Sequence, residues 1–391
     1  MPAWTLERVH IENYRSILRS TIELSDVTVL VGRNAAGKSN ILDAIQFMGD
    51  AIRQGLPAAL DGRTRLGRLS FGASIASVPG GIPQELRLEA VLSRSGEPGP
   101  PGPQQVSYGF ALAPERSFAV VEEWMAEDGK IASLIRGGRW VKGLASTQAL
   151  PTDRLVLPSL STAAPFDQLN HIRTLAPNPE LIRPPQENTP EVVLNRQGTN
   201  LYPCWGRLQA DHKELAERVA LLFGQIVPNA ARIQHKSMGA YSGITVGIKS
   251  SPGMSSPQDG ARLSDGSLRA LALLVGLYQP VPRLVTAIEE PENYIHPFAV
   301  ERLLDALVGA PDRGQLLLTT QSPTVLDAAA IRTEMLRVVE FRDGHTQVGT
   351  LAEAVANDLR SHLVTGGELL GEEFLAMEPT SPSQSLRPDV S

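Results

Sequence analysis

The sequence contains almost no cysteine and no long apolar run. Cys204 is the single cysteine among 391 residues, which excludes an internal disulfide framework and fits a reducing compartment. The longest apolar run, from Leu268 to Tyr278, contains Arg269 and is shorter than the roughly 20 residues needed to span a bilayer. Charged residues occupy the amino terminus, where a signal peptide would have an apolar core. We therefore expect a cytoplasmic protein with no membrane partner.

The chain also has no excess of positive charge. Its formal net charge is −6 at pH 7, so the protein as a whole does not attract nucleic acid, although a local basic surface remains compatible with this value. Hydrophobic residues make up 42% of the chain, which is typical of a soluble globular protein with a sizeable core. Its length of 391 residues exceeds one average domain and favours a single core with an inserted lobe.

The pattern of apolar residues predicts an α/β protein. Alternation indicates strands at residues 6–11, 22–24 and 86–92, and a hairpin with arms at 117–125 and 130–141 around Asp128-Gly129. Residues 151–235 are expected to be mostly helical, and residues 251–260 are expected to be a flexible segment. Further strands are predicted at 27–31, 242–250, 284–288 and 315–319, helices at 38–52, 267–278, 297–308 and from 324, and an edge hairpin at 335–350.

A glycine-containing loop lies between the predicted strand 27–31 and the helix that follows it. Its spacing, Gly-x4-Gly-Lys-Ser, is that of a P-loop, in which backbone amides and a helix amino terminus hold phosphates. Lys38 is predicted to reach the β- and γ-phosphates, and the Ser39 hydroxyl is predicted to hold Mg²⁺. The loop consists of Gly32, Arg33, Asn34, Ala35, Ala36, Gly37, Lys38 and Ser39. We therefore expect ATP and Mg²⁺ as cofactors.

Two adjacent carboxylates follow the apolar strand 284–288. Parallel sheets bind ligands at the carboxyl ends of their strands, and neighbouring residues there face different directions. Glu289 is therefore predicted to orient Mg²⁺ or its water, and Glu290 to polarise the attacking water as a general base. Outside this context such a pair would be an ordinary solvated charge pair.

The segment Leu263-Ser264-Asp265-Gly266-Ser267 precedes a predicted helix, about twenty residues before the acidic strand. Ser264 can cap this helix while exposed amides face an anion. Taken alone, a segment of this kind is common in loops at the start of a helix, where its serine serves as an N-cap. Its position before the acidic strand is what gives it functional meaning.

These segments together resemble an ABC-type ATPase of the RecF/SMC class, within the RecF-like AAA-domain ATPases. The resemblance is carried by Val9 to Ile17, by the loop ending Gly37-Lys38-Ser39-Asn40, by the LSDGS segment, and by Glu289-Glu290-Pro291-Glu292-Asn293 with His296-Pro297. It covers residues 1–50 and 200–330 specifically, and 85–200 only loosely.

The resemblance implies an ATP-dependent homodimer in which two heads sandwich two ATP molecules. It implies that Ser264, Asp265 and Gly266 would meet the nucleotide of the partner copy. Asn293 would lie in the D-loop across the interface, while Arg15 and Asn40 would help to hold the nucleotide. The implied fold is a P-loop NTPase of the ABC-ATPase head type, with a β-rich amino-terminal half and an inserted β/helical lobe.

One position departs from the family pattern. The family usually has Thr-His-Ser-Pro after its last core strand, whereas this chain has Thr320-Gln321-Ser322-Pro323. Glutamine can donate a hydrogen bond to the γ-phosphate but carries no proton or positive charge. We therefore expect nucleotide binding to survive and hydrolysis to be slower. Gln84 is a weak candidate for the Q-loop residue.

Two basic clusters are candidates for binding duplex DNA. One consists of Arg53, Arg63, Arg65 and Arg68, and the other of Arg136, Arg139 and Lys142 with Trp140. Phosphate contacts of this kind dominate DNA affinity. A solvated basic loop is an equal alternative for the first cluster and the favoured interpretation for the second.

The sequence therefore predicts a first ATPase lobe at 1–85, an inserted lobe at 86–235, a second ATPase lobe at 236–376 and a disordered tail at 377–391. The leading hypothesis is an ATPase whose head-to-head dimer acts on DNA or on an effector in DNA repair or genome defence. The alternative is a slow-turnover ATP sensor that regulates a separately encoded nuclease or toxin. A transporter subunit is disfavoured, because transporters generally carry Asp at the position of Glu289.

Overall fold

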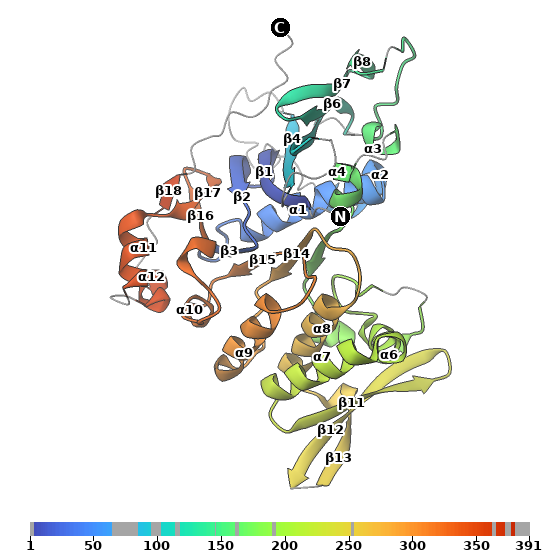
Figure 1. Cartoon of the computed structure of the whole chain (residues 1–391), viewed down its shortest axis with the longest axis vertical. Helices are drawn as coiled ribbons and strands as arrows, with labels where there is room; N and C mark the ends of the chain where they lie inside the picture. The colour runs from blue at the N-terminus through green and yellow to red at the C-terminus, as the bar shows by residue number, and fades with distance from the viewer. Residues whose placement is uncertain are drawn as a thin grey trace. The chain divides into compact units, whose positions relative to one another are not determined.

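The computed structural model describes residues 4–64, 85–94, 103–113, 118–144, 146–160, 164–189, 193–251, 254–361, 365–371 and 377–379. Two compact units are present (Figure 1). The first contains residues 1–172, 336–356 and 375–391, and the second contains residues 173–335 and 357–374. Arg65, Arg68, Gln84 and the predicted tail beyond residue 379 lie outside the described residues.

The first unit contains an antiparallel sheet of seven strands in the order β2-β1-β4-β5-β6-β7-β8. Its strands are β1 (Trp4–Tyr14), β2 (Ile17–Glu23), β4 (Leu86–Arg94), β5 (Gln105–Leu112), β6 (Val120–Glu127), β7 (Lys130–Arg136) and β8 (Arg139–Lys142). Alternating residues such as Leu88 and Phe110 are fully buried, as the period-two pattern predicts. The predicted hairpin arm 130–141 is in fact two strands, because Gly137 and Gly138 both take positive φ and turn the chain.

The remaining elements of the first unit include the strand that leads into the phosphate loop. The strands are β3 (Val27–Val31), β16 (Leu336–Arg342), β17 (His345–Leu351) and β18 (Met377–Pro379), and the helices are α1 (Lys38–Arg53), α2 (Leu56–Thr64), α3 (Leu157–Leu160) and α4 (Ala164–Leu169). β3 is buried along its whole length and pairs in parallel with β16. β16 and β17 form the predicted hairpin, and β18 adds antiparallel to β17.

The second unit places helices beside a parallel strand pair and a separate antiparallel sheet. Its helices are α5 (Pro179–Ile182), α6 (Leu201–Asp211), α7 (Lys213–Ile226), α8 (Asp265–Tyr278), α9 (Pro297–Val308), α10 (Pro323–Leu326) and α12 (Gly366–Gly371), with short 3-10 turns η2 (Gly260–Arg262) and η3 (Thr333–Met335). Its strands are β9 (Ile172–Leu175), β10 (Gln186–Glu187), β11 (Ala230–Met238), β12 (Tyr241–Ser251), β13 (Met254–Asp259), β14 (Val285–Glu289) and β15 (Gln315–Thr320). α11 (Glu353–Arg360) crosses the boundary between the units, and the first residue of β9 belongs to the first unit.

The core of the second unit forms around β14 and β15, which pair in parallel and are almost wholly buried. Apart from Arg269, α8 is apolar from Leu268 to its end and buries twelve of its residues, which is typical of a helix covered on every side. α6 and α7 pack against β11 of the separate sheet (Figure 1). The segment predicted to be flexible, 251–260, contains β13 instead, because its backbone pairs with β12. Within the described residues, no helix is long and apolar enough to cross a bilayer.

Candidate functional site

The loop between β3 and α1 has the conformation of an anion cradle. Arg33, Asn34 and Ala35 are exposed, Ala36 and Lys38 are buried, and Ala35 adopts the left-handed region at φ 63°. α1 begins directly after Gly37 and has no side-chain cap on its first amides. Because the first N–H groups of a helix have no intrahelical partner and carry partial positive charge, this end of α1 suits a phosphate.

Both glycines of the loop are required by close approaches. A Cβ on Gly32 would lie 2.1 Å from the carbonyl oxygen of Val339. A Cβ on Gly37 would lie 2.0 Å from the Oγ1 atom of Thr346, and Gly37 also has φ 104°. No side chain fits at these distances, so the hairpin β16–β17 contacts the loop closely through one backbone carbonyl and one side chain.

Lys38 extends back into the loop rather than out to solvent. Its Nζ atom donates to the carbonyl oxygens of Gly32 at 2.7 Å and Arg33 at 2.9 Å. An ammonium group is therefore already held at the centre of the cradle, and Ser39 is exposed on the first turn of α1 beside it. The donor set of uncapped amides, one ammonium and one hydroxyl fits a Mg²⁺-bound polyphosphate.

Arg15 lies beside α1 and is fixed by polar partners on that helix. Its guanidinium pairs with Asp43 at 2.7 Å and donates to the Oδ1 atom of Asn40 at 3.4 Å. The Tyr14 hydroxyl donates to the same Asp43 carboxylate, and burial together with Asp43 raises the pKa of Tyr14 well above its ordinary range. The predicted group of Arg15, Asn40 and the loop is therefore assembled within one unit.

The first basic cluster is neutralised by carboxylates of α1. Arg63 pairs with Asp43 at 3.1 Å and with Asp50 at 3.0 Å, and its side chain is only 13% exposed. Arg53 pairs with the same Asp50. These two arginines hold α2 and α1 together, so the structure does not support the predicted DNA surface at the described members of this cluster.

In the second unit, the LSDGS segment forms the start of α8. Ser264 caps the helix as predicted, since its Oγ atom accepts from the Ser267 amide at 3.2 Å. A Cβ on Gly266 would lie 2.3 Å from the carbonyl oxygen of Tyr294, so only glycine allows this contact. The segment therefore touches the loop that follows the acidic strand.

Arg183 fastens the same segment from the other side. Its guanidinium pairs with Asp265 and donates to the carbonyl oxygens of Ala261 at 2.7 Å and Leu263 at 2.8 Å. A single side chain thus binds two carbonyls of the turn that precedes α8 and the first residue of the helix. The sequence prediction missed this residue, because its partners are mainly backbone carbonyls, which no residue pattern marks.

The acidic strand end holds its two carboxylates in different environments. Glu289 pairs with Arg196 at 3.1 Å. Glu290 adopts φ 42°, a strained conformation for a non-glycine residue, while its amide donates to the Thr319 carbonyl at 3.1 Å. The Glu290 carboxylate accepts from the Nδ2 atom of Asn293 at 2.5 Å. The two carboxylates thus have separate contacts, and the division of roles that the sequence predicts for them stays a prediction.

Arg269 of α8 binds the backbone at this strand end. It is 6% exposed and donates to the carbonyl oxygens of Glu289 at 2.6 Å and Glu290 at 3.0 Å, and to that of Pro177 at 2.5 Å. Burial lowers the pKa of its guanidinium. The signal for this residue was present in the sequence, since an arginine inside a long apolar run must find buried acceptors.

Glu292 connects the acidic loop to the segment that contains Gln321. The Thr320 hydroxyl donates to the Oε1 atom of Glu292 at 2.6 Å, and the Ser322 amide donates to that hydroxyl at 2.9 Å. Burial raises the pKa of Glu292. Gln321, placed between these two residues, is partly exposed at the end of β15.

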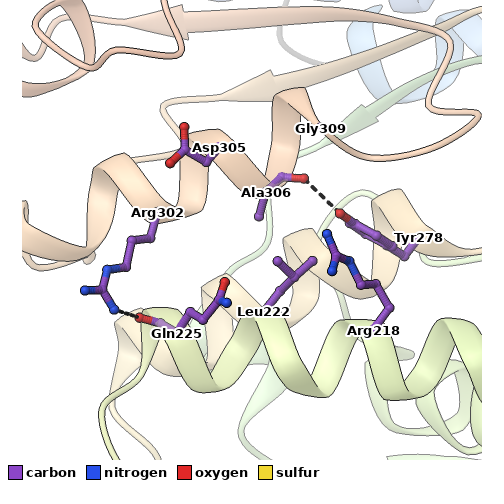
Figure 2. A pocket seen from close by; sticks show the side chains of 8 residues that line it. All are labelled: Arg218, Leu222, Gln225, Tyr278, Arg302, Asp305, Ala306 and Gly309. Atoms are coloured by element: carbon purple, nitrogen blue, oxygen red, sulfur yellow. Dashed lines mark hydrogen bonds between the residues drawn. The ribbon is translucent and has the colours of Figure 1, made fainter.

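The second unit also has a cavity of about 220 Å³ between α7, α8 and α9 (Figure 2). Two polar groups of its lining are already engaged, since Arg302 donates to the Gln225 carbonyl at 2.9 Å and the Tyr278 hydroxyl donates to the Ala306 carbonyl at 3.1 Å. The cavity contains none of the predicted site residues. Its lining consists of Arg218, Leu222, Gln225, Tyr278, Arg302, Asp305, Ala306 and Gly309.

The predicted site residues therefore form two groups, one in each unit. The loop, Arg15 and Asn40 lie in the first unit, and the LSDGS segment, the acidic strand end and Gln321 lie in the second. Their roles in binding and hydrolysis stay predictions.

Two protein families match parts of this chain. Residues 5–53 match an AAA ATPase domain. Residues 209–327 match an AAA domain described for the AbiEii toxin of a Type IV TA system. No curated protein sequence matches the chain significantly.

Solved structures of SMC head domains share the fold over most of this chain. An SMC head bound to the C-terminal winged-helix domain of ScpA has 15% identity and a TM-score of 0.58, covering 90% of this chain and 99% of that one. A head with an extended coiled coil bound to the C-terminal domain of ScpA, from Pyrococcus furiosus, has 14% identity and a TM-score of 0.57, covering 92% and 100%. A head with a coiled coil and joint from Pyrococcus yayanosii has 13% identity and a TM-score of 0.51, covering 92% and 100%. The predicted α/β P-loop fold and the predicted resemblance to SMC/RecF-like ABC-type ATPases are confirmed.

Proposed function

We propose that this protein binds ATP with Mg²⁺ at the loop Gly32–Ser39 and hydrolyses it when two copies pair. The observation that carries this proposal is the uncapped amino terminus of α1, behind a loop that only glycine permits and into which Lys38 extends. Bound ATP·Mg²⁺ would supply the phosphoanhydride bond that water cleaves. Lys38 and the loop amides would hold the phosphates, and Ser39 and Glu289 would orient the metal and its water.

Glu290 would act as the general base. Its backbone conformation is fixed by the Thr319 carbonyl and by Arg269, and its carboxylate is oriented by Asn293. A carboxylate held in this way can accept a proton from water without first reorganising. Replacing Glu290 with Gln keeps the shape and removes the base, so turnover should fall by at least about a hundredfold while ATP binding is retained.

The exposed surface beside the LSDGS segment supports pairing with a second copy. Ser264 is exposed, Tyr294 is 64% exposed and Phe298 is 88% exposed. The ring of Phe298 stacks on that of His296, with 5.5 Å between the ring centroids. Aromatic side chains at such exposure are typical of surfaces that become buried in a protein interface. In the proposed dimer, Ser264 and Gly266 of one copy would reach the phosphates held by the other.

Light scattering of the Glu290→Gln protein with and without ATP·Mg²⁺ tests this mechanism. We expect the mass to double with ATP, and we expect Ser264→Arg to prevent the doubling. Ser237→Arg is the matched control, because Ser237 is an exposed serine of β11. A mass that stays constant while ATP is bound would contradict the dimer mechanism.

The slow-turnover alternative rests on Gln321. A glutamine beside the γ-phosphate gives no positive charge, so a low basal rate is expected. Gln321→His should increase the rate if the rest of the site is competent for catalysis. No increase, together with normal ATP binding and pairing, would favour the ATP sensor that regulates a separate effector. The match to an AbiEii-type domain supports genome defence as the setting, and the ScpA-bound SMC heads support a protein partner.

DNA binding is better supported at the β7–β8 hairpin than near α1. Arg136 pairs with Glu122 at 2.5 Å, whereas Arg139 and Lys142 are exposed and form no ion pair within the described part of the chain. A duplex would contact these two cations through its phosphates, so binding should weaken as salt increases. Replacing both with alanine should reduce the affinity and the salt dependence, while Arg53→Ala should change neither. Salt-independent or unaltered binding by the double variant would refute this assignment.

A further inference from the structure

Thr346 is the second residue of β17 and contacts the phosphate loop, more than 300 residues away in sequence. Its side chain is fully buried, and its Oγ1 atom donates to the carbonyl oxygen of Ala36 at 3.0 Å. Its amide donates to the Ser16 carbonyl at 2.7 Å, which fixes this end of the hairpin against the β1–β2 turn. The same Oγ1 atom occupies the space that a Cβ on Gly37 would need.

The hydroxyl of Thr346 is the last link in a chain of hydrogen bonds whose direction can be assigned. Its single hydrogen is used on Ala36, so Ser16 must donate across the 2.7 Å contact between the two hydroxyls. The Oγ atom of Ser16 in turn accepts from the Nδ2 atom of Asn40 at 2.6 Å. The Oδ1 atom of Asn40 accepts from Arg15. A guanidinium is thus connected through three neutral groups to one carbonyl of the loop, and such chains polarise each other.

Fixing the Ala36 carbonyl also fixes the amide of Gly37. The two groups belong to one trans peptide plane, so they point in opposite directions. With the carbonyl held towards Thr346, the Gly37 N–H must face away from the hairpin. Without this contact the glycine, which has no Cβ to restrict it, could rotate the peptide plane and turn the carbonyl oxygen towards the phosphates.

We propose that Thr346 is a positioning residue for the phosphate loop, which it prepares for the anion by holding the Ala36–Gly37 peptide in one orientation. This inference rests on the proposed ATP binding. It assigns to the β16–β17 hairpin a role in nucleotide affinity, beyond its role in the sheet. The hydroxyl, rather than the volume of the side chain, is the group that acts.

Two substitutions separate the hydroxyl from packing. Thr346→Val keeps the volume and removes the hydrogen-bond donor, and it should weaken ATP·Mg²⁺ binding about tenfold, since one buried carbonyl and one hydroxyl lose their partner. Thr346→Ser keeps the donor and should stay within about twofold of the original affinity. Thr350→Val is the matched control, a threonine of the same strand whose position lies away from the loop. Isothermal titration calorimetry measures the affinities.

Amide hydrogen exchange in the nucleotide-free protein gives a second readout. The segment around Gly37 should exchange faster in Thr346→Val, but not in Thr346→Ser or Thr350→Val. Unaltered affinity and unaltered exchange in Thr346→Val would overturn the inference, because the hydroxyl would then serve packing alone. If the original protein binds no ATP, the proposed function fails, and the exchange experiment still decides whether Thr346 orders the loop.

Discussion

The two compact units hold their functional loops by different contacts. In the first unit, close glycine contacts and the neutral hydroxyl of Thr346 fix the phosphate loop, together with the ammonium of its own Lys38. In the second, the guanidiniums of Arg183 and Arg269 bind the backbone around the LSDGS segment and the acidic strand end. Charged donors make stronger hydrogen bonds than neutral ones, but a buried charge left without acceptors is costly. The first unit should therefore be sensitive to added volume, and the second to lost charge.

The largest effect on stability is expected from Arg269→Met. Three carbonyl oxygens, one in a buried and two in part-buried hydrogen bonds, lose their donor, and the free energy of unfolding should fall by about 4 kcal/mol. Urea unfolding measures this loss. Arg302→Met is the control, since Arg302 is exposed and donates to one carbonyl, and it should cost less than about 1 kcal/mol. Similar losses in both variants would mean that burial of the guanidinium does not matter.

Gly37→Ala tests the first unit by volume. The added Cβ meets the hydroxyl of Thr346 and must also adopt φ 104°, so about 3 kcal/mol of strain is expected and ATP affinity should fall by about a hundredfold. Gly344→Ala separates the two causes, because Gly344 also has positive φ but a Cβ there meets nothing within 4 Å. Calorimetric titration should show normal affinity for this control. If Gly344→Ala lowered the ATP affinity as much as Gly37→Ala does, the loss would be assigned to the backbone conformation alone.

The carboxyl group of Glu123 provides a test of whether the first unit also keeps a buried carboxyl neutral. It is fully buried on β6, accepts from the Tyr108 hydroxyl and from the amides of Val156 and Leu157, and burial raises its pKa to about 7. Because the folded state then binds the proton more tightly than the unfolded state, stability should fall as pH rises from the ordinary carboxyl range through about 7. The loss between pH 5 and 8 should be about 2 kcal/mol.

Unfolding in urea at several pH values measures this slope. Glu123→Gln cannot ionise and should show a flatter dependence over the same window. A slope that is identical in the two proteins would mean that Glu123 ionises normally when buried.

Local patterns predicted the fold well where the chain has strong periodicity. The strand β3, the helices α1 and α9 and the strand β15 were predicted to within about a residue, because buried strands are apolar throughout and helix starts carry proline or a phosphate-loop signal. β13 was missed, since its Ser- and Pro-rich sequence has low strand propensity and its pairing with β12 is a tertiary effect. The strands β7 and β8 were predicted as one arm, although Gly137 and Gly138 turn the chain between them.

The candidate site was predictable where chemistry depends on spacing, and not where it depends on partners distant in sequence. The loop Gly32–Ser39 and the cap Ser264 follow from local patterns. The partners of Arg63 and Thr346 lie up to hundreds of residues away or are backbone carbonyls, which every residue possesses. A basic cluster in a sequence therefore predicts a binding surface only when no carboxylate of a neighbouring helix can reach it.

The smallest effect, and the sharpest test of the comparison, is expected from Arg183→Met. Arg183 is partly exposed, so its loss should cost the folded protein only about 1 kcal/mol. The turn before α8 would lose its fixed shape, and ATP-dependent pairing in a Glu290→Gln background should weaken about fivefold, while ATP affinity at the loop of the first unit stays unchanged. Light scattering over a range of protein concentrations measures the pairing, with Arg207→Met as the control. If ATP affinity also fell, the functional loops of the two units would not be held independently. The contacts that hold the two loops would then belong to one coupled site.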